Sequence, residues 1–200
     1  IMQFLAWGTH KQDIMEKRAA LQKDHWAFWD DYEDRLIARG PLLNSDGSGP
    51  PTGNIHIITL NDWDEAKIIV TEEPYTKAGL FQDMVLTQFF LELDRTQFDS
   101  TGLPDRQGYF IYCPAADRVL EQQVKLASAH QDYCQSKDDI FACRGSILSD
   151  AGDWNGTAFL VEVSDEDAVT AFLEEEPYNA AGLFEEPRIT RWRRGGRPKT

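Results

Sequence analysis

A ten-residue string occurs twice in this chain of 200 residues, and it constrains the fold more than any other feature. Residues 72–81 read EEPYTKAGLF and residues 175–184 read EEPYNAAGLF, so eight of ten positions agree at a separation of 103. Self-similarity at a fixed separation is the signature of duplicated structural units. We therefore interpret the chain as two tandem copies of one small domain.

The match extends backwards from that string. GNIHII at 53–58 aligns with GTAFLV at 156–161, and RGPLL at 39–43 aligns with RGSIL at 144–148, now at a separation of 105. The change in separation places one small deletion in the 44–52 loop of the second copy. We expect a first domain at 1–90, a turn-rich linker at 91–107, a second domain at 108–194 and a basic tail at 195–200.

The spacing of apolar residues and the positions of glycine and proline give the order of helices and strands within one copy. A short apolar strand at 3–7 precedes a helical pattern from Asp13 to Arg39, and extended segments follow at 42–43 and 54–60. A second helix stops before Pro74, because a residue that precedes proline resists the helical conformation. A last strand is expected at 84–89, and Trp192 is expected to close its counterpart in the second copy.

Helix starts are indicated by a capping residue three positions before an acid. Asp62 stands three residues before Glu65 in the first copy, and Ser164 stands three residues before Asp167 in the second.

The order β-α-β-β-α-β is that of the ferredoxin-like split unit. Helices cover one face of its four-stranded sheet, and the second copy supplies a partner for the other face at high effective concentration. We therefore predict an α+β fold of two ferredoxin-like domains, packed sheet to sheet as a pseudo-dimer that resembles a dimeric α/β barrel. The chain is expected to be a monomer, and further dimerisation through unused edges is left open.

Charge and composition exclude several classes of partner. The formal net charge is −14, and the only strongly basic stretch runs from Arg188 to Lys199, where six basic residues stand without an acidic one. Such an acidic body repels phosphate backbones and anionic membrane surfaces, so neither nucleic acid nor membrane is expected as a partner. No long uncharged apolar run is present. The arginine-rich end is interpreted as a solvated tail.

Metal, cofactor and disulfide motifs are absent from the sequence. The three cysteines, Cys113, Cys134 and Cys143, form no Cys-x-x-Cys pair, and no glycine-rich phosphate loop occurs. The chain opens without a signal-peptide pattern. We expect reduced thiols, a cytoplasmic protein, no metal and no cofactor.

The motifs of each copy resemble those of the YCII-related (YciI-like) family. These are a helical histidine, Gly40-Pro41 after the helix, and an acidic-Pro-Tyr loop that runs into Ala-Gly-Leu-Phe. The resemblance covers essentially the whole chain, twice. It implies a dimeric ferredoxin-like fold with a His–Asp pair in a cleft. A few relatives are dehydrochlorinases of chlorinated hydroxyquinols, and the wider superfamily includes muconolactone isomerases and cofactor-free monooxygenases.

Transferred by position, the family pattern places catalytic pairs at His25 with Glu73 and at His130 with Glu176. The usual aspartate is a glutamate in both copies, and Gly-Pro becomes Gly145-Ser146 in the second. If one site has decayed, we expect it to be the second. The adjacent acids Glu72 and Glu175 remain alternatives. Expected substrate-binding residues are Trp7, Trp29, Pro41, Tyr75 and Tyr178.

An imidazole oriented by a carboxylate is a general base or acid near neutral pH. No serine or cysteine accompanies both histidines, so covalent catalysis lacks a nucleophile. Together with this pair, the family resemblance implies a cofactor-independent lyase, dehydrochlorinase or isomerase that acts on an aromatic or lactone metabolite. Alternatively, the histidines and aromatics belong to the core, and the protein is a non-catalytic small-molecule-binding or protein-interaction module with vestigial sites. His10 and His56 lack counterparts in the second copy and are interpreted as incidental.

Overall fold

Residues 1–197 are described by the computed structural model of the chain. The first copy contains β1 (Met2–His10), α1 (Met15–Asp30), η1 (Glu33–Arg35), β2 (Leu36–Leu43), β3 (Gly53–Leu60), α2 (Trp63–Glu72), α3 (Pro74–Lys77) and β4 (Phe81–Leu91). The connection carries one short turn, η2 (Gln97–Asp99). The second copy repeats the order with β5 (Gln107–Pro114), α4 (Leu120–Ser136), η3 (Asp138–Ile140), β6 (Phe141–Leu148), β7 (Trp154–Val163), α5 (Glu166–Glu175), α6 (Pro177–Ala180) and β8 (Arg188–Trp192).

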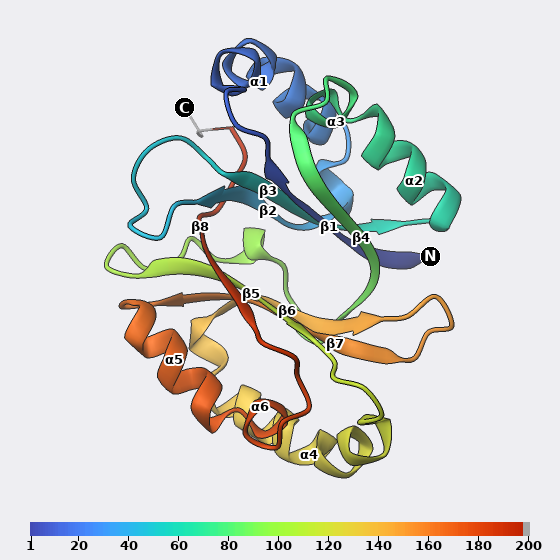
Figure 1. Cartoon of the computed structure of the whole chain (residues 1–200), viewed down its shortest axis with the longest axis vertical. Helices are drawn as coiled ribbons and strands as arrows, with labels where there is room; N and C mark the ends of the chain where they lie inside the picture. The colour runs from blue at the N-terminus through green and yellow to red at the C-terminus, as the bar shows by residue number, and fades with distance from the viewer. Residues whose placement is uncertain (198–200) are drawn as a thin grey trace.

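All eight strands form one closed antiparallel barrel in the order β1-β3-β2-β8-β5-β7-β6-β4. Figure 1 shows α1, α2 and α3 outside one half of this barrel and α4, α5 and α6 outside the other half. The barrel interior is therefore the interface between the copies. The predicted α+β pseudo-dimer, packed sheet to sheet, is confirmed.

The last strand of each copy crosses to the edge of the other copy. β4 pairs with β6, with Leu91 opposite Gly145, and β8 pairs with β2, with Trp192 opposite Leu42. These two seams close the barrel and leave no exposed strand edge between the copies. They also carry the residues after β4 and β8 into the opposite copy, where the candidate sites lie.

Glycines at the two seams permit this close approach. A Cβ at Gly40 would collide with the carbonyl oxygen of Arg193, and a Cβ at Gly145 would collide with that of Phe90. Each glycine thus lies on the second strand of its copy, where the backbone of the opposite copy passes too closely for any side chain. This requirement explains why glycine stands at the same position in both copies.

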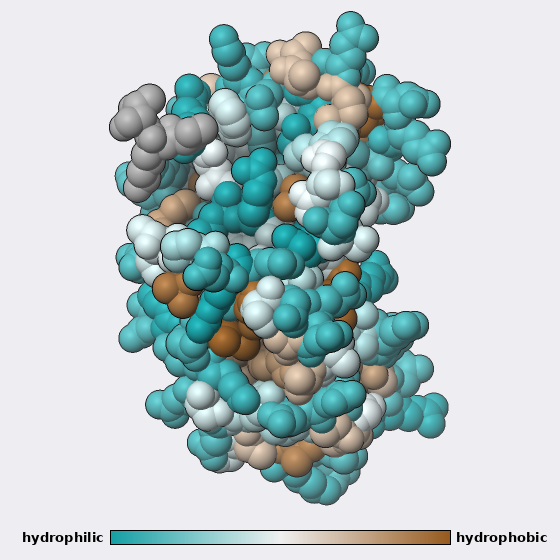
Figure 2. Space-filling model, turned by 90° about the vertical axis from the view of Figure 1, so that its left-hand side faces the viewer, coloured by the Kyte–Doolittle hydropathy of each residue, from teal (hydrophilic) through white to brown (hydrophobic). Residues whose placement is uncertain are grey.

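Apolar side chains fill the barrel and the space under the helices. The barrel interior holds residues of both copies, including Leu5, Trp7, Phe89, Phe110 and Trp192. Separate clusters lie between each sheet and its helices. Figure 2 shows a mostly hydrophilic outer face, with hydrophobic atoms gathered near the middle of the long axis where the copies meet. None of the helices in residues 1–197 is long and apolar enough to cross a membrane.

Several predicted boundaries are wrong. The first helix ends at Asp30 rather than Arg39, because Leu36 and the residues after it are buried in β2. The first and last strands of the first copy, β1 and β4, are also longer than predicted, since they pair along almost their whole lengths. The cap of α5 is Asp165, whose side chain accepts from the backbone N–H of Ala168, and not Ser164. The cap of α2 is Asp62, as predicted.

The interpretation of the arginine-rich end as a solvated tail is also wrong for the residues up to 197. Arg194 donates from Nε to Glu162 Oε1 at 2.8 Å, and Arg197 donates from Nε to Asp30 Oδ2 at 2.5 Å. The acidic body of the protein thus binds this segment back onto its surface. Residues 198–200 of the predicted tail lie outside the described part of the chain.

Candidate functional site

His25 and Glu73 form a buried hydrogen-bonded pair in the first copy. Helix α1 directs His25 toward the sheet, and Glu73 lies where α2 ends and α3 begins. The Nδ1–H of His25 donates to Glu73 Oε1 at 2.5 Å, and Glu73 Oε2 accepts from the backbone N–H of Thr76 at 2.9 Å. Glu73 therefore caps the N-terminus of α3, where the helix dipole favours a carboxylate.

The surroundings of Glu73 keep it ionised. Burial opposes the charge, but hydrogen bonds from His25 and from the backbone of Thr76 outweigh it and hold the pKa of Glu73 below its usual value. An ionised Glu73 fixes the proton of His25 on Nδ1, so the lone pair of Nε2 faces away from the carboxylate. Within residues 1–197, Nε2 of His25 has no hydrogen-bond partner.

Aromatic rings hold the histidine in place. The ring of Tyr75 stacks on that of His25 with centroids 4.1 Å apart and an interplanar angle of 3°. A second histidine, His56 of β3, lies 5.7 Å from His25 and stacks on Trp29 at 3.7 Å. Burial, reinforced by the nearby charge of Arg39, lowers the pKa of His56 well below its usual value, so His56 is neutral.

A cavity of about 300 Å³ opens beside His25. Its lining is rich in cations and has no carboxylate among the described residues. The walls come from α1, β2, β3 and the segment after β8; they include Arg18, Gln22, His25, Trp26, Arg39, Pro41, Asn54, His56, Arg193 and Gly195. The cavity thus belongs to both copies, because its last wall comes after the strand that crosses from the second copy.

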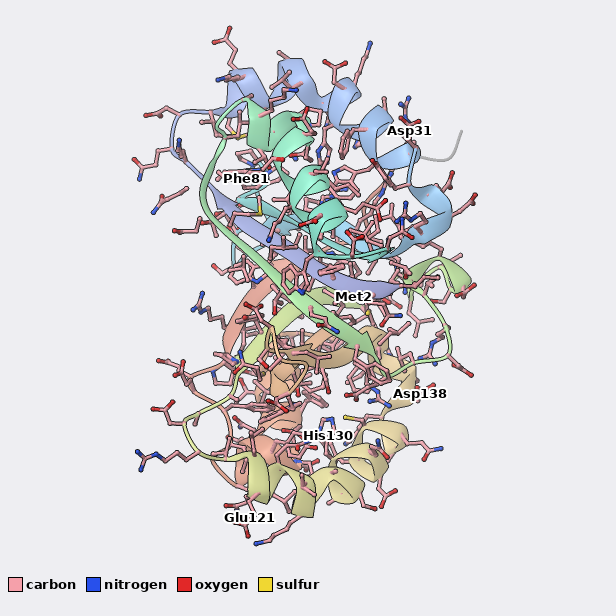
Figure 3. The ribbon with its side chains drawn as sticks, turned by 90° about the vertical axis from the view of Figure 1, so that its right-hand side faces the viewer. Met2, Asp31, Phe81, Glu121, His130 and Asp138 are labelled. Carbon is pink, nitrogen blue, oxygen red and sulfur yellow. The ribbon has the colours of Figure 1, made fainter. Side chains whose placement is uncertain are left out.

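The second copy repeats the histidine frame. His130 donates from Nδ1 to Glu176 Oε1 at 2.6 Å, and Tyr178 stacks on its ring at 4.2 Å. Glu176 caps α6 as Glu73 caps α3. Figure 3 shows His130 on the inner side of α4, whereas Glu121 at the start of the same helix points outward.

Glu92 distinguishes the second site from the first. It comes directly after β4 and places Oε2 2.6 Å from Arg144 Nη1 and 3.7 Å from His130 Nε2, while Oε1 accepts from Ser146 Oγ at 2.6 Å. Burial disfavours the imidazolium, but Cys134, Glu176 and Glu92 outweigh burial and raise the pKa of His130 far above its usual value. The surface depression beside Glu92 and Arg144 does not reach His130.

The sequence profile of the YCII-related domain matches residues 2–90 and again residues 108–193. The chain belongs to the YCII-related family. Two matched stretches in one chain confirm the tandem duplication inferred from the repeat. No curated protein matches this YCII-related chain.

Several solved structures resemble the tandem YCII-related fold. A variant chlorite dismutase from Candidatus Nitrospira defluvii is 10% identical, with 96% of this chain and 90% of that chain covered and a TM-score of 0.62. A heme-binding protein from Thermus thermophilus is 12% identical over 96% and 91% of the two chains, with a TM-score of 0.57. At these identities the likeness concerns the fold alone.

One structure matches about the length of a single copy. It is a 5-chloro-2-hydroxyhydroquinone dehydrochlorinase from Burkholderia phenoliruptrix in complex with 2,5-dihydroxybenzoquinone. It is 28% identical, the match covers 42% of this chain and 90% of that chain, and the TM-score is 0.40.

The four residues expected to be catalytic lie as two pairs in the YCII-related structure, His25 with Glu73 and His130 with Glu176. The adjacent acids point elsewhere, since Glu72 pairs with Lys77 and Glu175 with Lys137. The structure therefore distinguishes between neighbours that the sequence left open.

The residues expected to bind substrate behave differently from one another. Pro41 lines the main cavity. Trp7 packs in the barrel core against Phe110, while Tyr75 and Tyr178 lie behind the histidine rings, and Trp29 lies behind His56. The rings of Tyr75, Tyr178 and Trp29 support the site from behind, because a flat ring stacked on an imidazole buries one of its faces.

Sequence reasoning missed several residues of the cavity. Arg18 precedes His25 by two helical turns and so shares its face, a signal that the sequence contains. His56 was wrongly interpreted as incidental because the second copy has Phe159 at that position. Arg193 and Gly195 reach the first site from the other copy, and no local sequence pattern predicts that contact. Among residues 1–197, no cluster of three or more His, Cys, Asp or Glu residues has the arrangement of a metal site.

Proposed function

We propose that the first copy holds the active site of a small-molecule enzyme that works by proton transfer. The observation that carries the proposal is the pairing of His25 Nδ1 with Glu73, which leaves Nε2 free beside a cavity of about 300 Å³. That volume suits a single-ring metabolite. The acceptor, its orienting carboxylate and the nearby cations all belong to the chain itself.

In the proposed reaction, His25 Nε2 takes a proton from a phenol or from a carbon next to a carbonyl group. Glu73 stabilises the imidazolium that forms, as the carboxylate does in Ser-His-Asp systems. The substrate becomes a phenolate or an enolate. Arg18 and Arg39 line the cavity and would stabilise that negative charge in a site that excludes much of the water.

Two reactions can follow the transfer of the proton to His25. Return of the proton from His25 to another carbon gives an isomerisation. Return of the proton to a ring carbon that bears chlorine makes that carbon saturated and leads to a dehydrochlorination. His25 then takes a second hydroxyl proton, the electron pair of that O–H bond forms a C=O bond while a ring electron pair shifts to form a C=C bond and expel chloride, and His25 passes the second proton to water. Both fit the aromatic or lactone substrates that the family resemblance implies.

The second site is proposed to be inactive. An imidazolium held between Glu176 and Glu92 has no lone pair on Nε2 and cannot accept a proton. Its ring is also sealed from solvent, with His130 only 2% exposed. One active site per chain is therefore expected.

The test compares His25→Asn with the matched variant His130→Asn. Chlorinated hydroxyquinols, simple phenols and unsaturated lactones are incubated with each protein in D2O, and 1H NMR follows deuterium uptake, isomerisation and loss of chloride. We expect wild-type turnover of at least one compound, a fall on the order of 10²- to 10⁴-fold in His25→Asn, and a rate close to wild type in His130→Asn. Thermal unfolding verifies that both variants are folded.

Equal rates in wild type and His25→Asn would reject the proposal. Saturable binding of these compounds at the first site, with no exchange or turnover of any of them, would instead identify a non-catalytic small-molecule-binding module.

A further inference from the structure

The carboxylate of Glu92 occupies the place beside His130 that is hollow beside His25. In the second copy it contacts the guanidinium of Arg144 and the hydroxyl of Ser146, and it approaches the free ring nitrogen of His130. These three residues correspond to Arg39, Pro41 and His25 of the first copy at the repeat separation of 105. The second site therefore contains, in its own chain, a carboxylate bound by the shared frame of the repeat.

The equivalent position in the first site is Gly195. Glu92 donates its backbone N–H to the carbonyl oxygen of Arg144 at 3.0 Å, and Gly195 donates its own to that of Arg39 at 2.9 Å. The two residues are also separated by 103 positions, the spacing of the later part of the repeat. Gly195 has no side chain, and a Cβ there would lie 2.5 Å from Gly40 Cα. Among residues 1–197, the first site thus has no carboxylate in the place that Glu92 occupies in the second.

The first site has more positive charge than the second, although it lacks that carboxylate. Arg18 is 7% exposed, and its Nε has no hydrogen-bond partner among the described residues. Its counterpart, Gln123, is neutral and donates to the hydroxyl of Tyr178 at 2.9 Å. Arg193 adds another cation to the cavity lining, whereas Arg39 is partly neutralised by Asp30 at 3.2 Å.

The Arg18 guanidinium lies over the ring of Tyr75, with Cζ 5.2 Å from the ring centroid. Its buried Nε–H has no partner among the described residues, and a desolvated N–H is costly when hydrogen bonds do not compensate for the lost water. A planar anion in the cavity would supply those bonds, since guanidinium groups match carboxylate geometry. This preference arises within a protein whose formal net charge is −14, so it comes from the local arrangement and not from the overall charge.

We infer that Glu92 is an internal counterpart of the ligand, so that the first site binds small aromatic carboxylates through Arg18 and Arg39 beside His25. In the second site the carboxylate of Glu92 contacts Arg144, as a ligand carboxylate would contact the arginines of the first site, and it thereby closes the second site. The inference rests on the proposed function only in taking the first cavity as the ligand site.

The first experiment measures binding of benzoate and of its neutral analogue benzamide by isothermal titration calorimetry. We expect one benzoate per chain and at least roughly tenfold weaker binding of benzamide, because charge-assisted hydrogen bonds are the stronger ones. In Arg18→Gln, which introduces the residue of the second copy, benzoate affinity should fall roughly tenfold and benzamide affinity should change little. Equal binding of the two compounds by wild type, or unchanged benzoate binding in Arg18→Gln, would overturn the inference.

The second experiment opens the other site with Glu92→Ala. Removal of the side chain exposes Arg144 and His130, so a second benzoate should bind per chain. A stoichiometry that stays at one in the folded variant would overturn the assignment of Glu92. If this variant does not fold, benzamide and Arg18→Gln still decide the question at the first site.

The carboxylate site and the proposed catalysis are rejected by different results. Selective benzoate binding without turnover of any compound would leave the carboxylate site intact and reject proton-transfer catalysis. Turnover that depends on His25, combined with equal binding of benzoate and benzamide, would reject the carboxylate site and leave the proposed function standing.

Discussion

The imidazole of His56 lies flat against the indole of Trp29, with centroids 3.7 Å apart and an interplanar angle of 9°. This stack buries a neutral histidine between the helix and the sheet of the first copy. In the second copy Phe159, which has no titratable group, stands in place of His56. The two copies should therefore respond differently to pH.

Replacement of His56 by Phe should reduce the loss of stability in mild acid. The folded protein keeps His56 neutral because its pKa is lowered, whereas the unfolded chain binds a proton near pH 6.5. Below that pH the unfolded state holds the extra proton, so the unfolding free energy falls by up to about 1.4 kcal/mol per pH unit. Urea denaturation from pH 7 to 5 measures both slopes, and parallel lines for wild type and His56→Phe would contradict this expectation.

His130 should have the opposite effect on the pH dependence of stability, so that the protein becomes less stable as the pH rises. Its pKa is raised to about 12, so the folded protein retains a proton that the unfolded chain releases above pH 6.5. Stability from this group is complete below pH 6.5 and declines above it, by up to about 1.4 kcal/mol per pH unit. His130→Asn should therefore show a flatter dependence than wild type between pH 7 and 9. If the unfolding free energy of His130→Asn, measured by denaturation, changes with pH as it does in wild type, the folded protein does not hold His130 as an imidazolium.

Glu73→Gln should impair turnover while the fold survives. The amide can still accept from Thr76 but cannot stabilise an imidazolium, and it permits the wrong tautomer of His25. We expect kcat to fall on the order of 10³- to 10⁴-fold with KM little changed. Glu176→Gln is the matched control, for which kcat should remain near wild type. Comparable losses of kcat in both variants would mean that both sites catalyse the reaction.

Gly40→Ala should separate the β2–β8 seam. The added methyl group would meet the carbonyl oxygen of Arg193, which cannot move without displacing the wall of the cavity. Overpacking of this kind destabilises by about 1 to 3 kcal/mol. Gly145→Ala should cost a similar amount at the other seam, which equilibrium denaturation can compare. Benzoate affinity should fall in Gly40→Ala and persist in Gly145→Ala, and the reverse order would contradict the assignment of the cavity to the first copy.

The fold was predictable because it depends on patterns that are local or repeated. The EEPY strings, the alternation of strand and helix, and Pro74 identified the ferredoxin-like unit, and the duplication supplied its partner. The end of α1 was mispredicted because Leu36 continues the helical spacing, yet it lies on β2 and is buried between the sheet and the helices. Packing of the sheet against its helices is a tertiary effect that overrides the local pattern.

The candidate site was predictable only in its histidine–glutamate frame. The family resemblance paired His25 with Glu73, but two adjacent glutamates could not be distinguished without the α3 cap. Glu92 and Gly195 lay beyond sequence reasoning, because each comes after a strand that crosses to the opposite copy. Contacts of that kind depend on barrel closure and leave no periodic trace in the chain.

The crossing of β4 and β8 has a consequence for how such a protein can diverge. In a homodimer of single-copy chains, one codon determines the residue after the last strand at both sites, so the two sites must stay identical. Fusion of the copies gives each site a separate codon. Glutamate at 92 and glycine at 195 can then coexist, so one gene can encode two different residues at equivalent positions of the same frame.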